Sequence, residues 1–167
     1  KRIEEMLNKQ VNAELWAAYL YLSMSLDADT KGLPGVKNWF FVQAREEFDH
    51  SRIIQRYITA QDGRVELDAI PAVPTIWESP LCMFEDALKN EQRVTQMIHE
   101  LTHEAMRQQD YATISHLQWF IDEQVEEEDS ADQQVMAFSA ATDYISLHTL
   151  DKELAEREYK KAEPLVK

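Results

Sequence analysis

The sequence predicts an all-α protein: a four-helix bundle with a long crossover between helices two and three and a short fifth helix. Three observations support this prediction. The chain of 167 residues contains only three glycines and five prolines, so few residues interrupt a helix. Four long segments repeat apolar residues at alternating spacings of three and four, which is typical of bundle helices. A proline-bearing stretch separates the second segment from the third.

The first helix is expected at about residues 3–28 and the second at about 34–61. Gly32 provides a helix stop between them, and Pro34 suits the first turn of the second helix. Residues 64–80 contain three prolines, which exclude a regular helix there. A connection of this length is long enough, when extended, to run along a whole helix pair. We therefore expect it to cross the whole length of the bundle.

The third helix is expected at about residues 80–108, the fourth at 111–141 and the fifth at 145–161. Ser79 is a good N-cap for the third helix. The fifth segment has only a modest apolar face, and its charged end is expected to be solvated. A chain of this length is expected to form a single domain over residues 1–167.

The composition excludes several classes of protein. The formal net charge of −14 disfavours nucleic-acid partners, which need a basic face, and favours cations, although solubility alone would also account for it. No apolar run reaches the length of about 18 residues that a membrane helix needs. Cys82, the one cysteine, cannot build a disulfide framework, and the first residues do not form a signal-peptide pattern. We therefore expect a cytoplasmic protein without membrane or nucleic-acid partners.

Each long helix carries one acid where its apolar pattern calls for a core residue: Glu14, Glu47, Glu91 and Glu127. Within each predicted hairpin the two acids lie at similar distances from the turn, so antiparallel packing brings them level. His50 follows Glu47 by three residues and therefore lies on the same helix face. A single acid at such a position is usually a satisfied or edge residue, but four at matched depth with a histidine favour a metal site.

A repeat within the chain supports the same interpretation. A shift of 77 residues relates four pairs of polar residues: Glu14 and Glu91, Glu46 and Glu123, Glu47 and Gln124, His50 and Glu127. The two hairpins therefore look like copies related by an approximate twofold axis, which would gather these side chains at mid-bundle. Buried like charges repel strongly unless a positive charge lies between them. We therefore predict a site for two divalent metal ions, and oxygen-rich ligation with one imidazole favours iron or manganese over zinc.

The chain resembles the ferritin family, and within it the bacterial non-haem ferritins. The resemblance extends over nearly the whole chain, including the proline-bearing crossover and the short fifth helix. The stretches that carry it are residues 12–15, 19–21, 45–50, 89–92, 117–120 and 123–128. It implies a ferritin-like fold.

The resemblance also implies a ferroxidase centre with two irons. One iron would be held by Glu14, Glu47 and His50. The other would be held by Glu91 and Glu127, with Glu47 bridging the two ions.

Further residues receive roles from the resemblance. Gln124 would lie near the second iron, and Tyr21 would hydrogen-bond a ligand or pass an electron, although a plain core tyrosine is an equal alternative. A third iron site would share Glu127 with the centre. Its other three members would be Glu46, Glu123 and Glu126. From the residues alone, the alternative is that these three simply form a solvated acidic face.

The resemblance implies iron storage and detoxification, in which Fe(II) is oxidised to Fe(III) with O₂ or H₂O₂. Carboxylates are hard anions that stabilise Fe(III) over Fe(II), so they suit this oxidation. Ferric oxyhydroxide mineral would then be deposited inside a hollow homo-oligomeric shell of 24 subunits. The fifth helices would meet about a fourfold axis of that shell.

Other families fit less well. A bacterioferritin would carry a second Glu-x-x-His in the fourth helix, where this chain has Gln124 and Glu127, and a haem-binding methionine at Phe48, so no haem is expected. Rubrerythrins need a Cys-x-x-Cys site, and large di-iron oxidoreductases need longer chains. The small DNA-protecting relatives have no fifth helix. A metal-free helical scaffold is the non-enzymatic alternative, and it would leave the four acids exposed.

Overall fold

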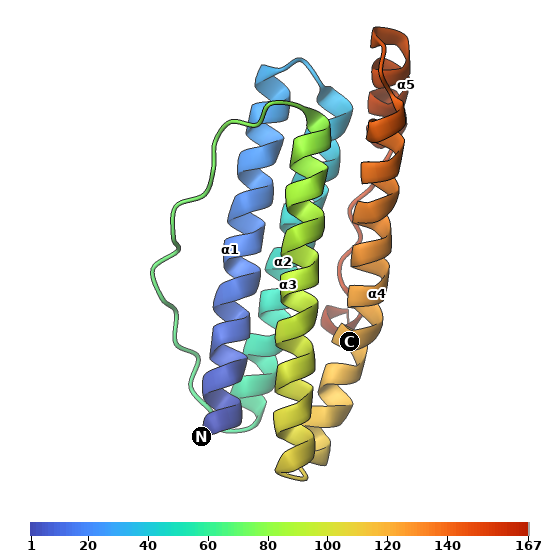
Figure 1. The fold of residues 1–167 in the computed structure, drawn as a ribbon. Coiled ribbons are helices and arrows are strands. Elements are labelled where there is room, and N and C mark those ends of the chain that lie inside the picture. The colour runs from blue at the N-terminus through green and yellow to red at the C-terminus, as the bar shows by residue number, and fades with distance from the viewer. Residues whose placement is uncertain (167) are drawn as a thin grey trace.

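A computed structural model describes residues 1–166, which form five α-helices and one 3-10 helix and contain no strand (Figure 1). This confirms the predicted all-α bundle. The elements in chain order are α1 (Arg2–Thr30), α2 (Pro34–Ala60), α3 (Pro80–Arg107), α4 (Tyr111–Ala140), α5 (Tyr144–Leu154) and η1 (Glu163–Leu165). None of the helices within residues 1–166 combines the length and hydropathy that crossing a bilayer requires.

The four long helices pack as two antiparallel hairpins, α1 with α2 and α3 with α4 (Figure 1). Their apolar side chains form two separate clusters. One lies toward the α1–α2 turn and contains Phe40 and Phe84, whose rings stack with centroids 4.8 Å apart. The other lies toward the opposite end and contains Ile54 and Phe120. Each long helix passes through both clusters, and the predicted acids lie in the interval between them.

The crossover between α2 and α3 runs along α1 over most of its length (Figure 1). Polar side chains on α1 form hydrogen bonds with backbone groups of the crossover. The Asn8 amide donates to the Arg64 carbonyl oxygen at 2.9 Å, and its side-chain oxygen accepts from the Glu66 N–H at 2.8 Å. Further along, the Ser23 hydroxyl donates to the Pro74 carbonyl oxygen at 2.6 Å. These bonds replace the partner strand that an extended segment otherwise needs.

The prediction that the fifth helix continues to residue 161 is wrong, because α5 ends at Leu154. The cause is Asn38 on α2. Its side-chain amide donates to the carbonyl oxygens of Leu154 at 3.1 Å and Arg157 at 2.9 Å. These contacts satisfy carbonyls at the helix end and turn the chain back along α2. The other helix ends lie within two residues of the expected positions.

The start of α2 is held against α5 by a close backbone approach. The Val36 N–H donates to Oδ1 of Asp151 at 2.8 Å, so an α5 carboxylate caps α2. Gly35 lies beside this contact, and a Cβ atom there would be 1.5 Å from the Asp151 carbonyl oxygen. Only glycine allows the two helices to approach this closely.

We predict that Gly35→Ala lowers the free energy of unfolding by about 1–3 kcal/mol, because the added methyl group forces α5 away from α2. Thermal unfolding followed by circular dichroism measures the effect. The control is Glu153→Ala on the exposed face of α5, which should change the stability by less than about 0.5 kcal/mol. Equal unfolding temperatures for the two variants would contradict the packing role of Gly35.

Candidate metal centre

A layer of buried polar side chains separates the two apolar clusters. The relative exposures are 0% for Glu14, 1% for Glu47 and His50, 2% for Glu91 and 6% for Glu127. A metal-free scaffold would leave these acids in solvent, so their burial counts against that alternative. Carboxylates buried this deeply require compensating positive charge, hydrogen bonds or protonation.

The structure brings the predicted ligands into overlapping groups. Glu14, Glu47 and His50 each offer one ligand atom, and these atoms lie within 4.8 Å of one another. Glu47, Glu91 and Glu127 form a second group of the same compactness. Glu47 belongs to both groups, so its carboxylate is placed to connect two metal positions.

Glutamine amides fill much of the remaining hydrogen-bonding capacity. Gln43 Nε2 donates to Glu47 at 2.9 Å and to Glu127 at 2.6 Å, so one amide joins α2 to α4. Gln124 Nε2 lies 3.2 Å from a carboxylate oxygen of Glu91. Gln124, predicted to lie near the second iron, therefore contacts one of the carboxylates predicted to hold that iron.

Glu14 is only half satisfied by protein groups. Gln10 Nε2 donates to its Oε1 at 2.7 Å, whereas Oε2 is buried without a hydrogen-bond partner among residues 1–166. A buried carboxylate oxygen without a donor is costly. A cation bound beside Glu14 would satisfy this oxygen.

Tyr21 lies fully buried beside the centre, and its hydroxyl donates to Oε1 of Glu91. Asn90 Nδ2 donates to the Tyr21 oxygen at 3.1 Å, and Arg93 in turn donates to Asn90 at 2.9 Å. Tyr21 is therefore oriented by a polar chain that leads toward the surface, and it contacts a candidate ligand directly. Burial raises the pKa of Tyr21 well above its ordinary value, and the carboxylates of Glu91 and Glu47 raise it further.

Burial raises the pKa values of Glu47, Glu91 and Glu127. The pKa of Glu91 rises to about 7, opposed by the hydrogen bond from Tyr21 and assisted by the charge of Glu14. The pKa of Glu127 rises to about 8, first through burial and then through the charge of Glu91. Near neutral pH the metal-free centre therefore holds protons that bound metal ions would replace.

Two opposing effects act on the pKa of His50: burial and the neighbouring carboxylates. Burial alone would lower its pKa, but the charge of Glu47, the nearby Glu123 carboxylate and the hydrogen bond to Glu47 raise it well above the ordinary value. His50 Nδ1 lies 3.2 Å from Glu47, and Nε2 lies 3.8 Å from Glu123. The imidazole thus lies between the centre and the flank between α2 and α4.

The residues predicted for a third site are only partly gathered. Glu123 and Glu127 lie within 4.8 Å of His50 Nε2 or Nδ1 as a third compact group. Glu46 lies on the same flank, but it forms an ion pair with Arg157, and Glu126 is exposed. The flank is lined by Glu46, His50, Glu123 and Glu126 and faces a groove of about 450 Å³.

Comparisons with known proteins address the origin of this arrangement. The profile of the Ferritin-like domain family matches residues 4–141. The chain belongs to the ferritin family. A bacterial non-heme ferritin of Staphylococcus haemolyticus is 38% identical over 160 residues, covering 95% of this chain and 96% of the relative. The corresponding protein of Staphylococcus aureus is 37% identical over 160 residues, with the same coverage.

Solved ferritin structures have the same fold. An open pore ferritin from the hyperthermophilic archaeon Archaeoglobus fulgidus superposes with a TM-score of 0.93 at 43% identity, covering 95% of this chain and 98% of that one. A closed form of the same archaeal ferritin, engineered by mutagenesis, gives a TM-score of 0.94 at 43% identity, covering 96% and 98%. The family resemblance expected from the sequence is thereby confirmed, and iron storage is the broad function of a ferritin.

Several contacts of this ferritin centre were missed by sequence reasoning. Gln10 and Gln43 each precede a candidate ligand by four residues, so the spacing that places side chains on one helix face could have revealed them. Asn90 precedes Glu91 directly and gave no such signal. Arg157 lies 111 residues after Glu46, and only the folded chain brings the two together.

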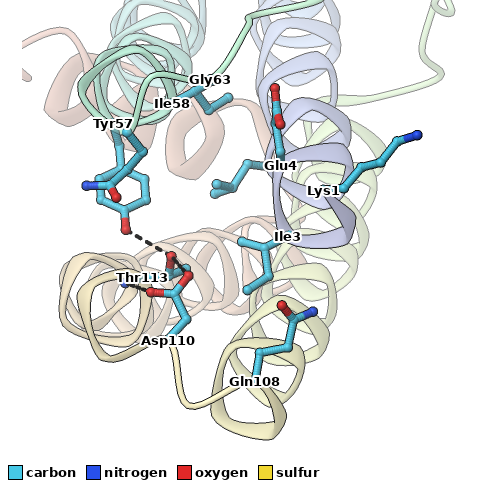
Figure 2. Close-up of a pocket in the computed structure, with 11 residues that line it drawn as sticks. Lys1, Ile3, Glu4, Tyr57, Ile58, Gly63, Gln108, Asp110 and Thr113 are labelled. Atoms are coloured by element: carbon cyan, nitrogen blue, oxygen red, sulfur yellow. Dashed lines mark hydrogen bonds between the residues drawn. The ribbon is translucent and has the colours of Figure 1, made fainter.

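A second cavity lies near the N terminus of this ferritin, away from the centre (Figure 2). It has a volume of about 210 Å³, and none of the predicted ligands lines it. Figure 2 shows the hydroxyls of Tyr57 and Thr113 hydrogen-bonded at 2.9 Å, with Thr113 donating to Asp110 at 2.7 Å. Tyr57, Thr113 and Asp110 satisfy one another's hydrogen bonds, and none of them belongs to the candidate centre.

The raised pKa values predict how the stability of the metal-free protein depends on pH. Glu91, Glu127 and His50 all bind protons more readily in the folded than in the unfolded state. Stability should therefore fall as pH rises from about 6.5 to 8, by up to about 1.4 kcal/mol per pH unit and group. The pKa of His116 is lowered to about 4 by burial, so its unfolded form binds more protons near pH 6.5 and the residue opposes the fall by only about 0.4 kcal/mol across this window.

Thermal unfolding of chelator-treated protein between pH 6.5 and 8 measures this slope. Glu127→Gln should flatten it, because the group with the pKa of about 8 is then removed. Saturating Mn(II) should reverse the slope, since metal ions and protons compete for the same oxygens. An unfolding temperature of the metal-free protein that rises across this window would contradict the prediction.

Proposed function

We propose that this ferritin oxidises Fe(II) to Fe(III) with O₂ or H₂O₂ at the buried centre and stores the product as ferric oxyhydroxide mineral. The observation that carries the proposal is the pair of compact ligand groups that share Glu47. One iron ion would be held by Glu14, Glu47 and His50. The second would be held by Glu47, Glu91 and Glu127, with Gln124 beside it.

The residues supply binding, charge and proton handling. Two Fe(II) ions held together can give two electrons to one oxidant, so O₂ with two protons yields H₂O₂, and H₂O₂ with two protons yields two water molecules. The four glutamates stabilise the higher charge of Fe(III) more than that of Fe(II). Protons displaced from Glu91 and Glu127 when iron binds are available within the same buried layer.

The flank between α2 and α4 is proposed as a third iron site and as part of the route between the centre and the mineral. Glu123 and Glu127 lie close to His50, which also belongs to the first ligand group. Glu46 and Glu126 extend the acidic surface outward along the groove. Carboxylates bind iron exchangeably, so successive oxygen ligands would let the ferric product leave.

We also propose that 24 copies of the chain enclose the mineral store. Exposed apolar side chains support extensive subunit contacts. On the α1–α2 face, Tyr19, Phe41 and Phe48 are 47%, 48% and 50% exposed. On α5, Tyr144 and Ile145 are 74% and 77% exposed, as expected if fifth helices meet their copies. Phe48, which replaces a methionine haem ligand, supports the expectation of a haem-free protein.

The ferroxidase proposal predicts that Glu47→Ala combined with His50→Ala reduces the initial rate of Fe(II) oxidation at least roughly 100-fold, since both metal positions lose ligands. Stopped-flow absorbance of ferric species in the near ultraviolet measures the rate in air. Asp129→Ala, which removes an exposed acid of α4, is the matched control and should keep the original rate. Unchanged activity in the double variant would refute the assignment.

Tyr21 is proposed to act on the second iron position through its hydrogen bond to Glu91. Tyr21→Phe should leave two Fe(II) ions bound per subunit and slow oxidation about tenfold, because Glu91 loses a hydrogen bond worth about 1–2 kcal/mol. Tyr57→Phe is the control, since Tyr57 bonds Thr113 away from the centre. A transient tyrosyl radical in electron paramagnetic resonance, lost only in Tyr21→Phe, would assign Tyr21 the electron-transfer role as well.

A further inference from the structure

The C-terminal segment, residues 155–166, returns from α5 and lies along α2 toward the middle of the bundle (Figure 1). It is anchored at several points. The Tyr159 hydroxyl donates to Asp49 at 2.6 Å, and the Ala162 N–H donates to the same carboxylate oxygen at 3.2 Å. Leu165 is 3% exposed and belongs to the second apolar cluster. The segment is therefore a packed part of the fold.

Arg157 is the residue of this segment that reaches the acidic flank. Its Nη2 donates to Glu46 Oε2 at 2.7 Å and to Gln43 Oε1 at 2.9 Å. Its Nη1 donates to the Trp39 carbonyl oxygen at 3.2 Å, and the guanidinium lies 4.4 Å from the centroid of the Trp39 ring. Four contacts fix the guanidinium, and the side chains of Arg157 and Glu46 are each only 22% exposed. This ion pair is therefore better shielded than an ordinary surface pair.

The contact with Gln43 connects the segment to the centre. The Gln43 oxygen accepts from Arg157, so its amide nitrogen faces Glu47 and Glu127. A change at Arg157 would remove the partner that holds this amide orientation. Arg157 thus touches one flank carboxylate directly and two ligands of the centre through one intermediate side chain.

Additional positive charge surrounds the same carboxylates. Lys160 and Lys161 line the groove that also contains Glu46, Glu123 and Glu126. Burial raises the pKa of Glu46, and the Arg157 charge only partly opposes this rise. Positively charged side chains of the chain itself therefore lie at the flank where a third iron ion would bind.

We propose that Arg157 occupies the carboxylate of Glu46 in place of a third metal ion, so that the C-terminal segment and a metal ion compete for this flank. The proposal rests on the proposed function and concerns how its third site is controlled. A divalent ion and a guanidinium cannot share the Glu46 oxygen without strong repulsion. Metal binding at the flank therefore requires Arg157 to leave, and this departure also releases Gln43.

Anaerobic titration of the metal-free protein with Co(II), followed by calorimetry, tests the proposal. The unmodified protein should bind two ions per subunit tightly and a third weakly. Arg157→Ala should tighten the third ion by at least about tenfold, because its competitor is removed. Lys152→Ala is the matched control: it removes an exposed positive charge from α5 that does not line the groove, and it should change the third affinity by less than about threefold. Arg157→Lys should give an intermediate result.

A gain in affinity separates competition from simple structural damage, since a loosened fold would weaken metal binding. Combining Glu46→Gln with Arg157→Ala should abolish the gain. A third affinity that is unchanged or weaker in Arg157→Ala overturns the proposal, and so does a gain that persists without the Glu46 carboxylate. Failure of the unmodified protein to bind the first two ions would instead refute the proposed function.

The mobility of the C-terminal segment provides a second test, separate from the measured affinity of the third ion. If metal and segment compete, a third equivalent of Co(II) must loosen the segment by the same coupling free energy. Hydrogen exchange of the Ala162 amide, which is bonded to Asp49, should then accelerate at three equivalents but not at two. Equal protection at two and three equivalents would contradict the competition.

Discussion

The structure depends on the burial of four glutamates at one level of a helical bundle. Burying one carboxylate is costly, and burying four near one another is more so because they repel. Apolar clusters above and below the layer exclude water, so solvent cannot hydrate these carboxylates. Protein groups meet part of it: amides of Gln10, Gln43 and Gln124 and the Tyr21 hydroxyl donate to these oxygens. Protons retained on Glu91 and Glu127 meet another part, and cations are suited to supply the remainder.

The two hairpins are copies in outline but differ in their chemistry. Glu14 and Glu91 are equivalent under the 77-residue shift, and both are buried. His50, however, corresponds to Glu127, and Gln43 corresponds to the apolar Phe120. The first hairpin therefore contributes the imidazole and two of the amide donors, whereas the second contributes mainly carboxylates. Two metal positions built this way would have unequal ligand fields and unequal affinities.

The end of the chain connects the outside of the bundle to this layer. Gly35 and Asp151 seat α5 on the start of α2, and the segment that follows places Arg157 against Glu46 and Gln43. Helix α5, which exposes Tyr144 and Ile145, is thus continuous with a side chain that touches the flank of the centre. Helix α5 and the acidic flank are joined by the short stretch of chain between Leu154 and Arg157.

The sequence alone determined the helices, the crossover and the set of buried acids, because these follow from periodicity, breakers and spacing along a helix. The i to i+3 relation of Glu47 and His50 and the matched depths of Glu14, Glu91 and Glu127 are local quantities that require no three-dimensional information. The tertiary structure alone decided the length of α5 and the contacts of Arg157. Helix α5 ends where Asn38 of α2 binds its carbonyls, and Arg157 meets Glu46 across more than a hundred residues. Contacts between distant segments depend on where the chain turns back in space, which no pattern along the sequence records.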